Sequence, residues 1–170
     1  MSRLTSMSPA ALRAVFSPDS DDTLIVLLTF SGSNIVGNIR LADNYTQRLL
    51  ETDEDIIYGV KSRGNDYLFL PFEFTLPTED DSAPRASLNI YDVNKQLLPS
   101  IRSLTTEPNV KIELVLASNP DVVEVDFGEF LLGNIKYNAD TISGDLTLET
   151  FENEPFPSGT FTPSYFPGLF

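Results

Sequence analysis

Hydrophobic and polar positions alternate over much of this chain, most clearly between residues 121 and 149. Val123, Val125 and Phe127 alternate with acidic residues, which is the period-two pattern of a strand with one buried and one exposed face. After Gly128 the apolar positions shift by one residue, to the other phase of the alternation. An inserted residue explains such a shift, so the pattern predicts a β-bulge or bend at the glycine within a meander of strands.

The remainder of the chain carries further strand patterns separated by turn compositions. These strands are predicted at residues 23–30, 39–41, 56–62, 67–76, 86–93, 110–117 and 142–148. The segment 23–30 is almost continuously apolar, which predicts a strand buried on both faces. Pro71 cannot donate a backbone hydrogen bond, so the strand that contains it is predicted to lie at a sheet edge or to bend there. Residues 45–55 lack clear periodicity and are predicted to form a loop.

Two short helices are predicted beside these strands. Ser8 followed by Pro9 is typical of a helix N-cap with proline at the first helical position. Leu12, Val15 and Phe16 then have helical spacing, which predicts one apolar stripe packed on a neighbouring element. The second helix is predicted near residues 97–104, where leucine and isoleucine recur every three or four positions.

These elements indicate a mostly β fold, either a β-sandwich or a split barrel with one or two short flanking helices. The 170 residues are enough for one buried core and too few for two comfortable domains. We therefore expect a β-sandwich domain over residues 1–150, followed by an extended tail over residues 151–170.

Charge and composition exclude several classes of function. The formal net charge of -14 opposes binding to phosphate backbones, so we expect no sequence-specific nucleic acid partner. Cysteine and histidine are absent, which removes disulfides, thiolate nucleophiles, imidazole bases and the ordinary zinc ligands. No segment approaches the roughly 20 apolar residues that cross a bilayer, and no signal segment is evident. We expect a chain made in the cytosol, with no membrane insertion.

Candidate sites of chemistry are weak. Acidic groups at residues 19–22, 51–55 and 79–81 offer oxygen ligands for calcium, but none has the twelve-position loop spacing of a calcium-binding loop, which favours solvated loops. Glu124 and Glu129 are a conceivable carboxylate pair for glycoside hydrolysis, although such pairs arise by chance in an acidic chain. Arg63-Gly64-Asn65 is interpreted as a hairpin turn, not an adhesion motif. We therefore predict no catalytic residue, no cofactor and no metal ligand.

The last twenty residues differ from the rest. Prolines exclude a helix, while aromatic residues supply more apolar surface than a solvated tail would carry. Burial of the rings alone does not offset the entropy of ordering the backbone, so the tail requires backbone hydrogen bonds or a second surface. That surface belongs either to its own domain or to a neighbouring subunit or partner. The predicted assembly contacts are Phe156, Phe161, Pro163, Tyr165, Phe166, Pro167, Leu169 and Phe170.

Several sequence blocks resemble, in order, a family of uncharacterised domains from tailed bacteriophages. The blocks are Leu27-Leu28-Thr29-Phe30, Ile39-Arg40-Leu41-Ala42-Asp43-Asn44, Leu70-Pro71-Phe72-Glu73-Phe74-Thr75-Leu76-Pro77, Leu88-Asn89-Ile90-Tyr91, Ile101-Arg102-Ser103-Leu104 and the terminal block from Phe161 to Phe170. The terminal Phe-x-Pro-x-x-Phe-Pro-Gly-Leu-Phe block is the most specific. Members are similar to minor tail proteins encoded near the tape measure, the cell-wall peptidase and the central fibre.

The resemblance implies a structural protein of the phage tail tip or distal tail, with a tail-tube-like fold and no catalytic residues. It implies a homo-oligomeric ring, hexameric in preference to trimeric, that joins the tail tube to the hub or central fibre. The chain would then reside in the virion, and in the host cytoplasm during assembly. If the ring lines a DNA conduit, its negative charge would repel the genome, and a basic bore would contradict this hypothesis.

Two other functions stay open at this point. A carbohydrate-binding β-sandwich of the tail tip would expose a row of aromatic side chains, and Tyr58, Tyr67 and Tyr91 are its possible members. An enzyme acting on peptidoglycan or capsule polysaccharide would use Glu124 and Glu129.

Overall fold

The structure, a computed structural model, describes residues 7–17, 20, 22–32, 37–51, 56–75, 86–92, 106–138 and 140–147. These residues form one helix, α1 (Pro9–Phe16), and ten strands. The strands are β1 (Leu24–Ser31), β2 (Ile39–Ala42), β3 (Gln47–Glu51), β4 (Ile56–Ser62), β5 (Asn65–Phe69), β6 (Phe72–Thr75), β7 (Ala86–Tyr91), β8 (Asn109–Leu116), β9 (Asn119–Tyr137) and β10 (Thr141–Thr147).

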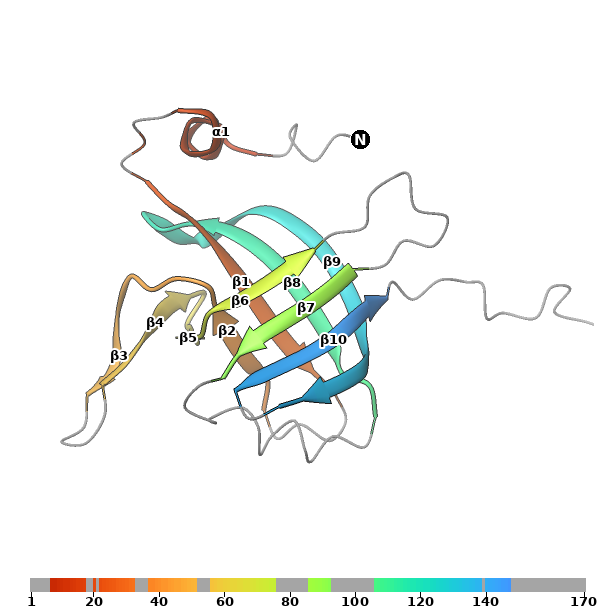
Figure 1. Cartoon of the computed structure of the whole chain (residues 1–170). Helices are drawn as coiled ribbons and strands as arrows, with labels where there is room; N and C mark the ends of the chain where they lie inside the picture. Colours follow the sequence, from red (N-terminus) through yellow and green to blue (C-terminus); the bar gives the residue numbers. More distant parts are fainter. Residues whose placement is uncertain are drawn as a thin grey trace, which may run out of the picture.

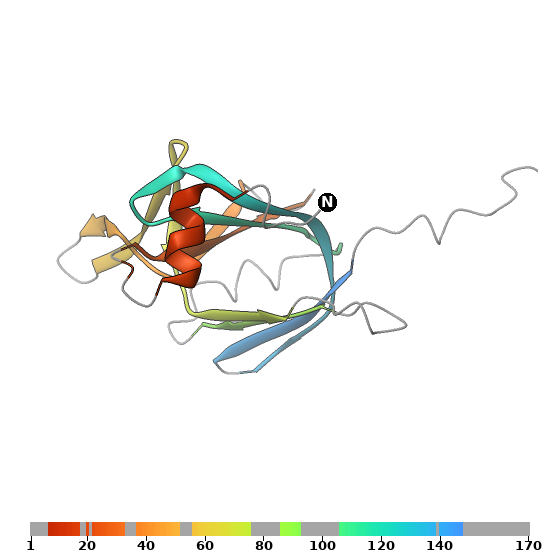
Figure 2. The ribbon, with the colours of Figure 1, turned by 90° about the horizontal axis from the view of Figure 1, so that it is seen from above.

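All ten strands belong to one sheet with the order β3-β4-β5-β2-β1-β8-β9-β10-β7-β6. The sheet is open but curves back on itself, so that β1, β2 and β8 form one layer while β6, β7 and β10 form the other (Figures 1 and 2). These two layers, with β9 between them, are called the barrel here. Strand β9 joins the two layers, because it pairs with β8 as far as Leu131 and with β10 from Leu131 to Tyr137. The prediction of a β-sandwich or split barrel with a flanking helix is confirmed.

The second connection between the layers lies at Leu70-Pro71. The amide of Leu70 donates to Ala42 at the end of β2, whereas the carbonyl of Pro71 accepts from Tyr91 at the end of β7. Consecutive residues therefore bond to strands of different layers, and the chain crosses over at the proline. The predicted bend at Pro71 is confirmed, since the proline falls between β5 and the edge strand β6.

The predicted bulge at Gly128 is also present. The register of β8 and β9 places Ile112 opposite Gly128 and Glu113 opposite Asp126, which leaves Phe127 as the extra residue. Gly128 has φ +90°, a conformation that favours glycine, and its amide donates to the Asp126 carboxylate at 2.8 Å. The bulge brings Phe127 and Phe130 onto the same inner face, where both contact the main core.

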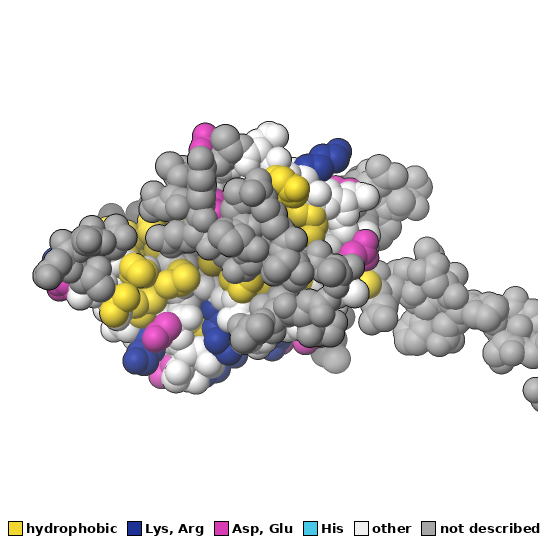
Figure 3. Space-filling model, turned by 90° about the horizontal axis from the view of Figure 1, so that it is seen from below, with side chains coloured by type: hydrophobic (Ala, Val, Ile, Leu, Met, Phe, Trp, Pro, Cys, Tyr) yellow, Lys and Arg dark blue, Asp and Glu magenta, His cyan; other side chains and the backbone are white. Residues whose placement is uncertain are grey.

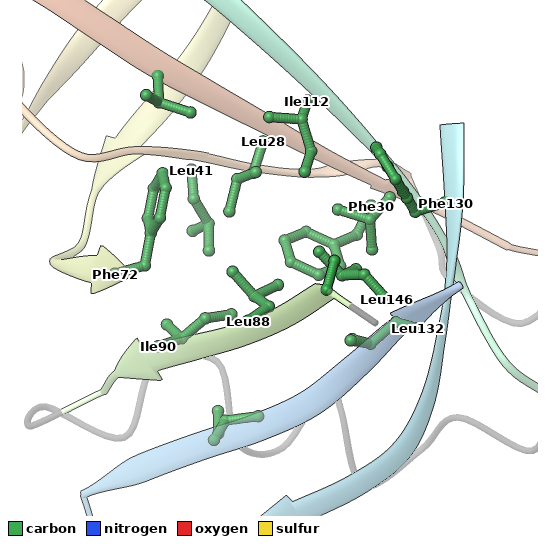
Figure 4. Packing of buried hydrophobic residues seen from close by; sticks show 14 of the residues in the cluster. Leu28, Phe30, Leu41, Phe72, Leu88, Ile90, Ile112, Phe130, Leu132 and Leu146 are labelled. Carbon is green, nitrogen blue, oxygen red and sulfur yellow. The ribbon is translucent and has the colours of Figure 1, made fainter. Parts of the chain in front are cut away.

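The main core fills the space between the layers and contains Leu28, Phe30, Phe72, Leu88 and Phe130 among its buried members (Figure 4). A smaller cluster covers the opposite face of the first layer; its buried members are Ile25, Leu27, Ala42, Val60, Tyr67 and Val115. Alternate residues of β1 thus enter different clusters. This confirms the prediction of a strand buried on both faces.

One prediction about the chain needs correction, and two others fall outside the described part. The segment predicted to be a loop at residues 45–55 contains strand β3. Most of its side chains are exposed, so no core face imposes a period-two pattern on its sequence. The predicted second helix near residues 97–104 and the tail at residues 151–170 lie outside the described residues.

Helix α1 begins where the sequence predicts, but its predicted packing stripe is wrong. Val15 and Phe16 are 45 % and 69 % exposed, whereas Ala11 is fully buried. The reason lies at the helix N-terminus, where the Glu124 carboxylate of β9 accepts hydrogen bonds from the amide and the hydroxyl of Ser8, each at 2.8 Å. The Ser8 hydroxyl in turn accepts from the amide of Ala11 at 3.1 Å. These contacts fix the N-terminus of the helix, with the small Ala11 side chain buried and the larger Val15 and Phe16 side chains exposed to solvent.

Replacing Ser8 by alanine is expected to lower the free energy of unfolding by about 1–2 kcal/mol, because it removes the helix cap and one partner of buried Glu124. Urea denaturation measures the loss. Ser8→Thr retains the hydroxyl and serves as the control, with an expected change below about 0.5 kcal/mol. Equal losses for both variants would show that the hydroxyl does not hold the helix.

Candidate functional site

The hairpin of β3 and β4, called the arm here, projects from the barrel at the end of the sheet (Figure 1). Leu50 and Ile56 lie at its far end and are 52 % and 46 % exposed. In the register, Leu50 is opposite Ile57 and Ile56 is opposite Glu51, so the two exposed side chains lie on opposite faces of the arm. Figure 3 shows hydrophobic side chains at the surface on the side where the arm lies.

An aromatic cluster of Tyr45, Tyr58 and Phe69 lies in the same part of the sheet as the arm. The ring of Tyr45 lies 5.0 Å from that of Tyr58 and 5.2 Å from that of Phe69, measured between centroids. The contact with Phe69 is edge-to-face, a favourable geometry for aromatic pairs. Tyr45 nevertheless remains 50 % exposed, so half of this side chain stays accessible to solvent.

Strand β3 is the terminal strand of the sheet, paired only with β4 among the described strands. Its outer edge therefore carries backbone N–H and C=O groups that another strand can pair with. Its charged side chains, Arg48 and Glu51, form an exposed ion pair at 3.3 Å, so the edge has no net charge. An uncharged edge beside exposed apolar side chains suits a docking segment that is itself uncharged and partly apolar.

The arm is anchored to the barrel through the β4–β5 turn, which confirms that Arg63-Gly64-Asn65 is a hairpin turn. Arg63 and Gly64 both have positive φ, at 50° and 75°, as a two-residue hairpin turn requires. The guanidinium of Arg63 donates to both carboxylate oxygens of Glu113 on β8, at 2.9 and 2.6 Å. This pairing joins the turn to the outer face of the first layer.

The Glu113 carboxylate is nearly buried, and its partners determine its charge state. Hydrogen bonds from Arg63 and then from Lys111 hold the pKa of Glu113 below its usual value, against the opposing effect of burial. The same carboxylate raises the pKa of Arg63 and of Lys111. The arrangement is a charge-paired structural anchor, with Lys111 also bonded to Asp126 at 3.2 Å.

Glu124 and Glu129, the conceivable carboxylate pair for glycoside hydrolysis, are not brought together. Glu124 holds Ser8, whereas Glu129 is exposed and lies opposite Lys111 in the register. Five residues of strand separate their Cα atoms by roughly 16 Å. Glycosidases place their two carboxyl groups about 5–9.5 Å apart. The Cα atoms lie farther apart than this range of carboxyl separations, and the Glu124 carboxylate is engaged by Ser8, so the geometry does not favour a hydrolytic pair.

The acidic groups proposed as calcium ligands fall mostly outside the described residues. Two that are described already have partners: Asp22 accepts from the amide and hydroxyl of Ser118, and Glu51 pairs with Arg48. Within the described ranges, no group of three or more acidic side chains is placed to hold a metal ion.

The tyrosines proposed for carbohydrate binding do not form a row. Tyr67 is 3 % exposed, and its hydroxyl lies 3.3 Å from both Arg63 Nη2 and Thr29 Oγ1. Tyr58 belongs to the aromatic cluster of the arm, and Tyr91 lies on β7 in the other layer. Burial of Tyr67 removes it from any exposed platform.

The eight tail residues predicted as assembly contacts lie outside the described residues. Strand β4 of the arm was predicted at residues 56–62, but β3 and the exposed apolar side chains of Tyr45, Leu50 and Ile56 were not recognised as a site. Isolated apolar residues without a period were its only sequence signal.

Comparison with protein-family models and with curated proteins finds no match to this chain. In the part of the chain that the structure describes, no helix is long and apolar enough to cross a membrane.

Proposed function

We propose that this chain is a structural component of a tailed-phage tail tip or distal tail, where it assembles as a ring that joins the tail tube to the hub or central fibre. The sequence resemblance supplies the phage context. The mostly β fold suits such a role, and the net charge of -14 suits a particle through which DNA passes. Its partners would be further copies of itself and neighbouring tail proteins.

The observation that carries the proposal is the arm. Its strand β3 has a partner on only one side among the described strands, and Tyr45, Leu50 and Ile56 are exposed in the same hairpin region, so a hydrogen-bonding edge and apolar side chains occur together. Soluble monomers protect or shorten such edges, because exposed edges pair with other chains. An assembly subunit instead uses the edge, since pairing satisfies the backbone groups and removes the apolar side chains from water.

Deleting residues 161–170 is expected to leave a folded monomer and to abolish ring formation. Size-exclusion chromatography with multi-angle light scattering should give the full chain one discrete mass at a multiple of the 18.8 kDa subunit, a hexamer being favoured. The truncated chain should have the mass of one shortened subunit and an unchanged circular dichroism spectrum. A truncated chain that fails to fold would place the tail within its own domain, and a full chain that stays monomeric would contradict the ring.

A further inference from the structure

We infer that the arm of one subunit is the docking site for the C-terminal segment, residues 155–170, of the next subunit in the ring. This inference rests on the proposed function and specifies which surfaces meet. It defines a head-to-tail contact, in which each subunit offers a segment at one side and a receptor at the other. Such heterologous contacts generate rings when the rotation between subunits closes.

The two ends of the contact lie on opposite sides of the molecule. Strand β10, the last described strand, ends at Thr147 on the right of Figure 1, whereas β3 lies at the far left; the perpendicular view in Figure 2 agrees. The chain therefore leaves the barrel on the side away from its own arm. A neighbour placed beside this exit, in the same orientation, presents its arm directly to the departing segment.

Chain length permits the contact. The 23 residues that follow Thr147 can extend to roughly 75 Å, and the first 11 of them, as far as Ser158, to roughly 36 Å. A domain of about 150 residues has a diameter of roughly 40 Å, estimated from its radius of gyration. The segment can therefore reach the arm of a neighbour that lies beside the end of β10, and its last residues can continue along that neighbour.

Charge favours the same pairing. Residues 155–170 contain no charged side chain, in a chain whose net charge is -14. Two copies of the chain repel one another, and this neutral segment approaches a second copy with the least electrostatic opposition. The outer edge of β3 is likewise neutral through the Arg48–Glu51 pair, and it stands beside exposed Leu50 and Ile56, which can bury the aromatic rings of the segment.

The segment and strand β3 offer runs of equal length for backbone hydrogen bonding. Prolines cannot donate to a strand, and the longest proline-free run within residues 155–170 is Ser158–Thr162, five residues bracketed by Pro157 and Pro163. Strand β3 also spans five residues. We therefore assign Ser158–Thr162 as an added strand on β3, with Phe161 contacting the apolar surface of the arm and the terminal aromatic block continuing past it.

Complementation between two full-length variants tests the assignment. The arm variant, Leu50→Lys with Ile56→Lys, keeps an intact segment; the segment variant, Phe161→Ser with Phe166→Ser, keeps an intact arm. For each variant alone, the apparent dissociation constant for assembly should rise at least about tenfold, as expected for central apolar contacts. At a concentration just sufficient for the wild type to assemble, each variant should therefore be monomeric. Mixed together, they should form a one-to-one dimer and nothing larger, because only one productive contact per pair remains.

Val122→Lys is the matched control, since Val122 is 48 % exposed on β9 and outside the arm. This variant should assemble like the wild type. An arm variant that assembles normally, or that stays monomeric but does not pair with the segment variant, overturns the inference while the ring of the wild-type chain stands. A wild-type chain that remains monomeric overturns the proposed ring and this contact together. A circular dichroism spectrum of the arm variant that matches the spectrum of the segment variant, which is also monomeric, excludes misfolding as the cause.

Discussion

The substitution Gly59→Ala is expected to lower the free energy of unfolding by about 3 kcal/mol, because the new methyl group has no room. Gly59 lies in β4 opposite Leu68, and a Cβ atom there would lie 2.0 Å from the carbonyl oxygen of Tyr67. It would also lie 2.5 Å from Leu49 Cδ1. A backbone carbonyl in a paired strand cannot move alone, so β4 and β5 must separate locally.

Urea denaturation at one fixed protein concentration measures this loss, since assembly would otherwise add a concentration-dependent term. Gly133→Ala is the matched control in β9: its Cβ would approach only the flexible Glu107 side chain, at 3.0 Å, which can move aside at a cost below about 1 kcal/mol. The double variant Leu49→Ala with Gly59→Ala separates the two clashes. It should recover little stability, because the carbonyl clash persists, and full recovery would show that Leu49 alone was responsible.

The close approach at Gly59 also connects stability with the proposed contact. The Leu49 side chain occupies the space beside Gly59, so β3 can approach β4 this closely only because residue 59 has no side chain. The arm keeps its shape through this contact and through the ring cluster of Tyr45, Tyr58 and Phe69. A receptor strand that is held in place before binding costs less conformational entropy when the partner docks.

Much of the barrel could be predicted from the sequence, because strands with one buried face carry their periodicity in the residue order. The phase shift after Gly128 revealed the bulge, because an inserted residue changes which positions face the core. Pro71 indicated the bend at which the chain crosses between the layers, because proline cannot donate to a strand. In each case a local rule of backbone geometry and the global fold require the same feature.

Long-range contacts could not be predicted in the same way. The packing side of α1 depends on Glu124, 116 residues away from Ser8, and no local pattern contains that pairing. Strand β3 lacks a buried face, so its sequence has no alternation of apolar and polar residues that would indicate a strand. The Arg63–Glu113 ion pair joins residues 50 positions apart, which no local pattern contains. Strand β4 was predicted, but the arm as a site was not, because β3 is exposed and the arm is positioned by contacts that are distant in sequence.

The substitution Glu113→Gln should lower the free energy of unfolding by about 2–3 kcal/mol near neutral pH. It breaks a nearly buried ion pair and leaves Arg63 and Lys111 without their shared carboxylate. The value lies below that for a fully buried pair, since both cationic side chains are 35 % exposed and water can partly replace the lost contact. Loosening of the β4–β5 turn should also loosen the arm, which hydrogen exchange of residues 56–62 would detect.

The pH dependence identifies the charge as the cause. Arg63 and Lys111 hold the pKa of Glu113 below its usual value of 4.5, so the folded state favours the ionised carboxylate. Its contribution to stability is complete above the unfolded pKa, and it disappears as the pH falls through the lower folded pKa. The difference in unfolding free energy between the wild type and Glu113→Gln should therefore be constant above about pH 5.5 and shrink steadily below pH 4.5.

Glu51→Gln provides the comparison, because it removes the same group from an arginine pair whose two side chains are more than half exposed. Its effect should stay below about 0.5 kcal/mol at every pH, as for most surface ion pairs. Urea titrations of the three proteins between pH 3 and pH 7 measure both differences. Equal effects at Glu51 and Glu113, or a Glu113 difference that persists unchanged at pH 3, would mean that packing of the side chain, not its charge, fastens the arm to the barrel.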